Sequence, residues 1–157
     1  MSSDLFASTM KAACYFQHGG AQIDIVHSYP KPILQPGDIL IKVLTASVNP
    51  IDIKLHQNNF RNAVLPLPKV PGRDFCGIVE EMSEPSGRWN IGDRVMGLLP
   101  DMFKPWGACS EYVAMNELHI VKVPPSMSNA EAASLPFVSM VVVQALAPFV
   151  DSCEGIP

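Results

Sequence analysis

Alternating apolar and polar positions predict a mainly β structure over the first 123 residues. The strongest pattern covers residues 39–48, where Ile39, Ile41 and Val43 fall on one face of a strand. Further strands are predicted at residues 10–16, 22–26, 75–82, 94–98, 108–114 and 119–123. Gly19-Gly20 indicates a hairpin between the first two strands. The sequence therefore predicts a mostly antiparallel sheet.

Helix signals occur at two places. Asn49 is a favoured N-cap residue, and Pro50 after it is favoured at the first helical position. With the acidic Asp52 in the first turn, these signals predict a short helix at residues 50–57. After residue 127, Ser128-x-x-Glu131 is a capping box that starts a helix. Leu135-Pro136 should break it, followed by a second helix at residues 137–149 and a loop at 151–157.

Residues 132–150 carry no charge, and their length alone would allow a membrane span. Pro136 and Pro148 bracket this stretch, and Ser139 and Gln144 interrupt it. We therefore expect a buried helix at a domain junction and no membrane association.

Composition narrows the class of protein. The chain has 157 residues, 48% of them hydrophobic and 17% charged, which fits one folded domain and argues against disorder. Fifteen prolines disfavour a long helical bundle. A net charge of −4 without a basic run disfavours nucleic acid as a partner.

Cysteine usage and the N-terminus predict a cytoplasmic protein. The cysteines Cys14, Cys76, Cys109 and Cys153 are far apart, which fits neither a disulfide framework nor a zinc finger and suggests reduced thiols. The first ten residues carry Asp4 and no Lys or Arg, unlike secretory or mitochondrial targeting segments.

Spacing alone assigns no chemistry. The four histidines form no metal-binding motif, and there is no Gly-x-Ser-x-Gly. Neither a Gly-x-Gly-x-x-Gly turn nor a Walker loop occurs within the 157 residues, so nothing here would cradle a pyrophosphate.

Five motifs in order carry a family resemblance that runs from about Met10 to Leu146. They are Ala46-Ser47-Val48-Asn49-Pro50-Ile51-Asp52, Pro71-Gly72-Arg73-Asp74-Phe75-Cys76-Gly77-Ile78-Val79, Gly92-Asp93-Arg94-Val95, Trp106-Gly107-Ala108-Cys109-Ser110-Glu111-Tyr112 and Ala132-Ala133-Ser134-Leu135-Pro136-Phe137. The chain resembles the medium-chain dehydrogenase/reductase superfamily, and within it the zinc-independent quinone-oxidoreductase branch.

The resemblance implies a fold class that is mainly β with helices. It implies a GroES-like barrel of mostly antiparallel strands at residues 10–127, after a flexible N-terminus at 1–9. Residues 128–157 would be junction helices leading to a Rossmann domain that is absent from this chain. With that domain gone, the apolar helix near residues 141–143 would be exposed and prone to self-association.

Ligand chemistry by resemblance predicts no metal site. Asn49 stands where zinc-dependent relatives have a cysteine ligand, and Arg73 stands where they have a histidine ligand. A guanidinium offers only donors and does not bind zinc. The structural zinc of those relatives needs four clustered cysteines, and only Cys109 falls in that region.

The implied reaction is hydride transfer from NADPH to a quinone or an α,β-unsaturated carbonyl. The resemblance makes Asn49, Asp52 and Arg73 the candidate catalytic residues, and Asn49 and Val141 the candidate cofactor-binding residues. Structural roles are open beside these: Asn49 as a helix cap, Asp52 as a first-turn acid, and Arg73 as the partner of Asp74. Tyr112 is expected to be core packing.

Two positions depart from the family pattern. Phe60 replaces a tyrosine whose hydroxyl is the proposed proton donor in related enoyl reductases, so that route is closed. Val141 replaces a threonine that faces the nicotinamide, and valine cannot make its hydrogen bond.

The resulting hypothesis is the N-terminal catalytic domain of a reductase, inactive alone because the pyrophosphate site is absent. It would act on a small carbonyl or quinone substrate and form a homodimer only through the missing domain. The alternative is a non-enzymatic binding module, or a pseudoenzyme that uses the barrel for a protein partner. A cochaperonin would share only the barrel topology, which does not license function.

Overall fold

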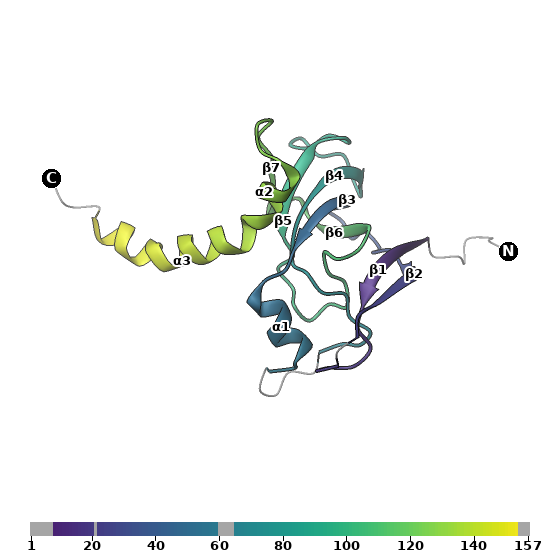
Figure 1. Cartoon of the computed structure of the whole chain (residues 1–157). Coiled ribbons are helices and arrows are strands. Elements are labelled where there is room, and N and C mark those ends of the chain that lie inside the picture. The colour runs from purple at the N-terminus through teal and green to yellow at the C-terminus, as the bar shows by residue number, and fades with distance from the viewer. Residues whose placement is uncertain (1–7, 21, 60–64, 154–157) are drawn as a thin grey trace.

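The structure, a computed structural model, describes residues 8–20, 22–59 and 65–153. The elements in chain order are β1 (Thr9–Cys14), β2 (Asp24–Pro30), β3 (Asp38–Ser47), α1 (Pro50–His56), β4 (Asp74–Met82), β5 (Arg94–Leu98), β6 (Tyr112–Asn116), the 3-10 turn η1 (Glu117–His119), β7 (Ile120–Lys122), α2 (Asn129–Ser134) and α3 (Pro136–Cys153). Strands therefore dominate up to residue 122, and the last two helices follow them (Figure 1).

Every strand pair is antiparallel, which confirms the predicted sheet type. β1 and β2 form a two-stranded sheet, and the other strands form a five-stranded sheet in the order β6-β3-β4-β5-β7. The long pairing of β3 with β4 is interrupted by two shifts of register, which bend the strands and help the sheet to curl. The expected fold class, mainly β with helices, is thereby borne out.

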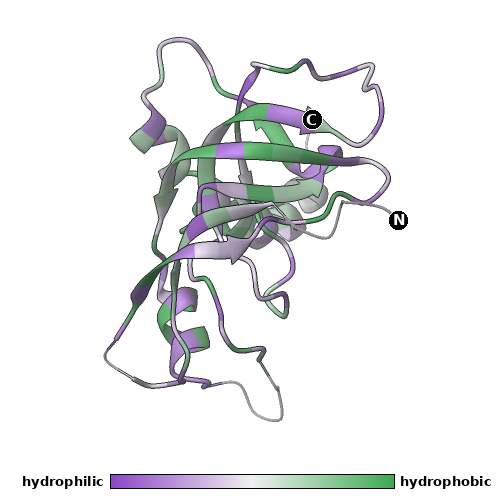
Figure 2. Cartoon of the chain, turned by 90° about the vertical axis from the view of Figure 1, so that its right-hand side faces the viewer, coloured by the Kyte–Doolittle hydropathy of each residue, from purple (hydrophilic) through white to green (hydrophobic). Residues whose placement is uncertain are grey.

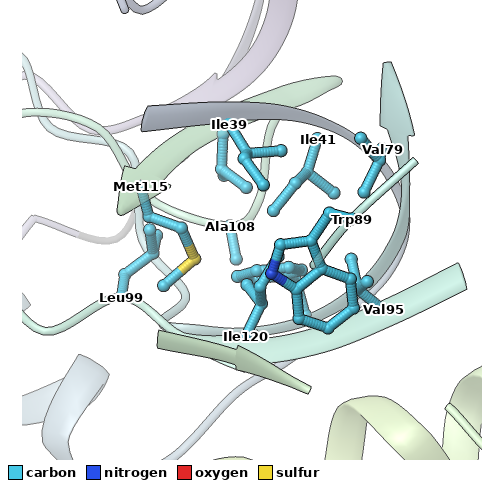
Figure 3. Close-up of a cluster of buried hydrophobic side chains, with 11 residues drawn as sticks. Ile39, Ile41, Val79, Trp89, Val95, Leu99, Ala108, Met115 and Ile120 are labelled. Atoms are coloured by element: carbon cyan, nitrogen blue, oxygen red, sulfur yellow. The ribbon is translucent and has the colours of Figure 1, made fainter. Parts of the chain in front are cut away.

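The main core lies inside the curl of the five-stranded sheet. Ile39 and Ile41 from β3 are buried there, and Trp89, Val95 and Ile120 pack around them (Figure 3). The face predicted from Ile39, Ile41 and Val43 is confirmed, with Val43 only partly buried. Figure 2 shows hydrophobic (green) and hydrophilic (purple) stretches along the strands. Leu40, between the two isoleucines, is buried as well.

Arg94 at the start of β5 fastens the segment before α2. Its guanidinium donates hydrogen bonds to the carbonyls of Pro124 and Met127 and to Asn129 Oδ1, each at 2.8–3.0 Å. The predicted capping box is present, with the Ser128 backbone N–H donating to Glu131 at 2.8 Å and the Glu131 N–H donating back to Ser128 Oγ at 3.2 Å. The first junction helix is therefore fixed to the sheet at its N-terminal end.

Several predicted boundaries differ from the structure. The strand expected at residues 108–114 is instead β6, displaced to Tyr112–Asn116, because residues 108–111 bond to other segments. The loop expected at 151–157 is helical as far as Cys153. Of the flexible N-terminus expected at 1–9, residues 1–7 lie outside the described residues, whereas Thr9 already belongs to β1.

Helix α3 is exposed near residues 141–143, as expected for a junction helix without the Rossmann domain, and is not buried in this chain. It begins at Pro136, as the predicted break requires, and then leads away from the sheets (Figure 1). Val141 is 49% exposed and Val143 is 63% exposed, because no described element covers this middle part of the helix. No helix among the described residues is both long enough and apolar enough to cross a membrane.

We expect the 157-residue chain to self-associate through α3. Contiguous exposed apolar surface favours association in water. Light scattering should give a mass that rises with protein concentration, and a double variant, Val142→Lys with Leu146→Lys, should reduce that rise. Both side chains are about half exposed, so the fold should tolerate lysine there. A monomer at all concentrations would contradict this expectation.

Candidate functional site

Asn49 lies between the end of β3 and the start of α1. Its backbone N–H donates to Asp52 Oδ2 at 2.8 Å, and the Asp52 N–H donates to the Asn49 carbonyl at 2.9 Å. Pro50 occupies the first helical turn, where its missing N–H costs nothing. Asn49 is the N-cap residue of α1, as predicted. The two hydrogen bonds with Asp52 fix the backbone conformation of Asn49.

Asp74, the first residue of β4, fixes the side chain of Asn49. Its side chain is fully buried, and its Oδ2 accepts a hydrogen bond from Asn49 Nδ2 at 2.9 Å and another from Ser47 Oγ at 3.2 Å. Burial raises the pKa of Asp74, while the bonds from Asn49, the Phe137 N–H and Ser47 lower it. The end of β3, the start of β4 and the start of α3 thus meet at one carboxylate.

Asp52 is a second buried carboxylate beside Asn49. Its Oδ1 accepts the Gly72 N–H at 3.2 Å, so it bonds both the residue before α1 and the residue before Arg73. Burial raises the pKa of Asp52, and the two backbone N–H groups and the positive charges of Arg73 and Lys69 oppose that rise. Asp52 therefore joins two of the sequence motifs rather than only capping a helix.

Arg73 turns away from Asp74. Its Nε and Nη2 donate to the Leu99 carbonyl at 2.9 and 2.6 Å, and Nη2 also donates to the Pro100 carbonyl at 2.9 Å. The Arg73–Asp74 pair expected from the sequence forms no salt bridge among the described residues. Burial lowers the pKa of Arg73, and the charges of Asp52, Asp74 and Asp101 oppose that effect. Arg73 thus holds the loop after β5.

Lys69 is a buried cation that sequence reasoning missed. Its side chain donates to the carbonyls of Met102 and Lys104 at 2.8 and 2.6 Å, so it holds the same loop as Arg73 from another side. Burial lowers the pKa of Lys69 to about 8, although Asp101 and Asp52 favour its charged form. Nothing in the proline-rich stretch around it distinguishes Lys69 from a solvent-exposed lysine.

We expect Lys69 to give the fold a stability that rises with pH. The pKa of Lys69 is about 8 in the folded chain and about 10.5 in the unfolded chain. Between these pH values the unfolded chain binds more protons, so the free energy of unfolding increases as the pH rises. Between pH ~7.5 and ~9.5 the gain should be about 2 kcal/mol.

The measurement is the free energy of unfolding in urea as a function of pH, for the wild type and for Lys69→Met. Burial raises the pKa of Cys14, Cys76 and Cys109, which makes stability fall with pH in both proteins and cancels in their difference. As the pH rises, the free energy of unfolding of the wild type should increase relative to that of the variant. Parallel dependences of the two free energies on pH would contradict the lowered pKa of Lys69.

The structure brings together three of the four predicted site residues. Asn49, Asp52 and Arg73 are all buried and are connected through Gly72 and Asp74. Val141 lies on the exposed part of α3, and its predicted contact with the cofactor stays a prediction. Phe60 lies outside the described residues.

Tyr112 is half-buried at the second, smaller core, with Lys31 Nζ 3.8 Å from its ring centroid. This agrees with its expected packing role. In the described part of the chain, no group of three or more His, Cys, Asp or Glu side chains is placed to hold a metal ion. Cys14, Cys76 and Cys109 are free thiols.

The cluster can orient a small ligand. Asp74 holds the Asn49 amide nitrogen, and the two backbone bonds with Asp52 hold its main chain, so the amide plane is fixed before a ligand arrives. Nδ2 also donates a longer hydrogen bond to Ser47 Oγ at 3.4 Å. A polar group held in this way binds a ligand with little reorganisation. Phe137 lies next to the cluster, with its ring centroid 6.0 Å from the Arg73 guanidinium carbon.

Comparison with known proteins identifies the relatives of this arrangement. Residues 35–125 match the family described as alcohol dehydrogenase GroES-like domain. The spinach (Spinacia oleracea) chloroplastic quinone-oxidoreductase homolog is 33% identical over 91% of this chain and 44% of its own length. An NADPH-dependent alkenal/one oxidoreductase of Arabidopsis thaliana is 32% identical over 81% of this chain and 34% of its own length.

A solved structure agrees with these sequences. The quinone oxidoreductase from Coxiella burnetii superposes with a TM-score of 0.79 at 33% identity, over 88% of this chain and 44% of that one. The chain thus spans less than half the length of the relatives described here. It belongs to the family of alcohol dehydrogenase GroES-like domains, in the medium-chain dehydrogenase/reductase superfamily.

Proposed function

We propose that this chain is the catalytic-domain part of a zinc-independent, NADPH-dependent reductase of quinones or α,β-unsaturated carbonyls. The observation that carries the proposal is the position of Asn49: its side-chain Nδ2 donates to Asp74 and its backbone N–H donates to Asp52. By resemblance, zinc-dependent relatives carry a metal ligand at this position. The names of the relatives supply the substrate class, since they include quinone and alkenal/one oxidoreductases.

The donor set supports chemistry without zinc. Arg73 stands at the other metal-ligand position of zinc-dependent relatives, and its guanidinium is already committed to the carbonyls of Leu99 and Pro100. A guanidinium has no lone pair to offer a metal. Polarisation of a substrate carbonyl would then fall to neutral hydrogen-bond donors and not to a Lewis acid.

A nicotinamide cofactor is part of the proposal, which the NADPH-dependent alkenal/one oxidoreductase among the relatives supports. NADPH supplies the hydride when bound. Asn49 would contact the nicotinamide or the substrate carbonyl, and α3 would carry Val141 toward the cofactor side. Arg73 and Lys69 would keep the loop of residues 99–104 in place beside the substrate. The pyrophosphate of the cofactor would need a Gly-x-Gly-x-x-Gly turn, and the 157 residues contain no such motif.

A specific observation favours a second candidate, a binding module. A groove of about 550 Å³ lies beside β6, lined by Ile33, Trp106 and Met115 among others, and contains none of Asn49, Asp52 or Arg73. This volume lies in the range of small-molecule pockets. A module that acts through this groove would need no NADPH.

Turnover separates the two candidates. We would join the chain to the nucleotide-binding part of the Coxiella burnetii quinone oxidoreductase and follow NADPH oxidation with phenanthrenequinone. The chimera should oxidise NADPH, with and without a metal chelator, whereas the 157-residue chain alone should not. Turnover by the chain alone would overturn its predicted inactivity, and loss of turnover with chelator would overturn the zinc-independent mechanism.

Location and assembly are further parts of the proposal. We propose a cytoplasmic enzyme whose subunits pair through a nucleotide-binding domain. The composition and the reduced thiols support the location, although relatives in spinach and Arabidopsis thaliana are named as chloroplastic. Fractionation of cells that express the tagged gene product would test the location directly.

A further inference from the structure

A small cavity with mixed polar and apolar walls lies beside Asp52 and Arg73. It is lined by Tyr15, Asp52, Lys69 and Arg73, together with the backbone of residues 70–72 and part of the loop after β5. The space open to the centre of a water molecule is about 10 Å³. That is close to the smallest volume that holds one water, and far below the volume of an organic ligand.

Tyr15 supplies a buried hydroxyl without a partner. The residue is 1% exposed, and its Oη makes no hydrogen bond with any described protein atom. A buried hydroxyl that has left water without gaining a partner is unfavourable, and such groups in native proteins are nearly always paired. The lining of the cavity by Tyr15 shows where a partner could be.

The other walls of the cavity offer further hydrogen-bonding capacity. Lys69 Nζ has three N–H groups and uses two of them on the carbonyls of Met102 and Lys104. Each Asp52 oxygen accepts one backbone N–H and retains a second lone pair. Donors and acceptors therefore surround the same water-sized space, as a buried water requires.

We propose that one internal water molecule occupies this cavity and bridges the Tyr15 hydroxyl to the Asp52 carboxylate, with Lys69 as a third partner. The water accepts from the lysine ammonium and donates to the carboxylate. Tyr15 completes the arrangement as donor or acceptor, because a hydroxyl can be either. The presence of the water does not depend on the proposed function, whereas the role of Tyr15 toward Asn49 rests on it.

The water makes Tyr15 a positioning residue for the candidate site. Asp52 receives the N–H groups of both Asn49 and Gly72, so a change in its ionisation would alter both bonds. A water that donates to Asp52 favours the ionised form, which accepts those bonds best. Tyr15 would thus act on Asn49 through the water and Asp52, without touching a substrate.

Several charged or titratable groups surround this water. Lys69, Arg73 and Asp74 interact with Asp52, as does Cys109 from the segment before β6. The rings of His18 and His56 also contact Tyr15, with centroids 5.9 and 4.6 Å from its own. Their buried Nδ1 and Nε2 atoms, respectively, have no hydrogen-bond partner among the described residues. Burial raises the pKa of Tyr15 to about 12, so its hydroxyl keeps its proton at neutral pH.

A high-resolution crystal structure of the chain tests the proposal directly. We expect one ordered water within hydrogen-bonding distance of Tyr15 Oη, an Asp52 carboxylate oxygen and Lys69 Nζ. A cavity without electron density, or a direct bond from Tyr15 Oη to another protein atom, would overturn the proposal.

A variant supplies a second measurement. In Tyr15→Phe the bridge is lost, so the water should become weaker or disappear, and the pKa of Asp52, followed by the ¹³C shift of its carboxyl carbon, should rise. Tyr112→Phe is the matched control, since Tyr112 lies under Lys31 and away from the cavity. An unchanged water and an unchanged Asp52 pKa in Tyr15→Phe would show that the Tyr15 hydroxyl does not bind this water, and would overturn the proposal. If the variant does not fold, the wild-type density decides.

Discussion

Substituting Gly107 with alanine is expected to lower the free energy of unfolding by about 3 kcal/mol, the upper part of the range for overpacking. An added Cβ would lie 2.5 Å from the Pro71 carbonyl oxygen and closer still to that of Val70. Both are backbone atoms, which cannot move aside as a flexible side chain could.

The fixed position of these carbonyls explains the size of the effect. The N–H groups of Ala108 and Cys109 donate to the carbonyls of Gly72 and Pro71 at 2.8 and 3.0 Å, so the two segments run side by side. Relief of the clash would break these bonds and shift Gly72, whose N–H binds Asp52. The damage should therefore reach the candidate site.

Urea unfolding of Gly107→Ala and Gly87→Ala tests this expectation. A Cβ at Gly87 would meet nothing within 4 Å, so that variant should stay within about 0.5 kcal/mol of the wild type. Equal stability of the two variants would contradict the close approach of residues 70–72 to residue 107.

Arg73→Met is the second substitution with a large expected effect, a loss of about 2–3 kcal/mol. The guanidinium makes three hydrogen bonds to the carbonyls of Leu99 and Pro100, and methionine can make none. The change also removes the positive charge that lowers the pKa of the buried Asp52. Loss of the bonds and loss of the charge both act against the folded state.

The pH dependence separates these two causes. Without Arg73 the pKa of Asp52 should rise further, so the ionised carboxylate becomes costlier to bury. The loss of stability should therefore be largest near neutral pH and smaller in acid, where Asp52 is protonated in both proteins. Arg88→Met, at an exposed arginine over Trp89, should cost less than about 1 kcal/mol at either pH. A loss of stability that does not vary with pH would show that the lost hydrogen bonds alone destabilise Arg73→Met, without a contribution from the charge.

Local patterns were sufficient to predict much of the fold. The alternation of Ile39 and Ile41 fixes the buried face of β3, and the Asn49-Pro50 and Ser128-x-x-Glu131 signals place the starts of α1 and α2. Each of these depends on neighbours within a few residues. Sequence therefore carries them directly.

Features that depend on distant segments could not be predicted in this way. Residues 108–111 have a strand-like pattern, but Glu111 bonds to Lys11 and Cys109 to Pro71, which delays β6 to Tyr112. The orientation of Arg73 is set by the Leu99 carbonyl, 26 residues away, and not by the adjacent Asp74. The exposure of α3 is predicted by the family resemblance, which places this helix at the junction with a missing domain; its apolar composition alone predicts burial.

The candidate site shows the same division. The family resemblance pointed to Asn49, Asp52 and Arg73, and the structure joins them through Asp74 and Gly72. Lys69 and Tyr15 were not found, because a lone lysine in a loop and a tyrosine near a strand end have no signal that separates buried from exposed. Their roles depend on burial, which arises only when the loop after β5 packs over them.

The most direct test of the account is the turnover of the chimera when Asn49 is replaced by alanine. Removal of one pre-oriented polar group at a reacting carbonyl costs on the order of a hundredfold in kcat. We expect a loss of about that size in NADPH oxidation with phenanthrenequinone, while Asn59→Ala, at an exposed asparagine, should leave turnover unchanged. Unchanged turnover in a folded Asn49→Ala chimera would contradict the assignment of this cluster as the active site.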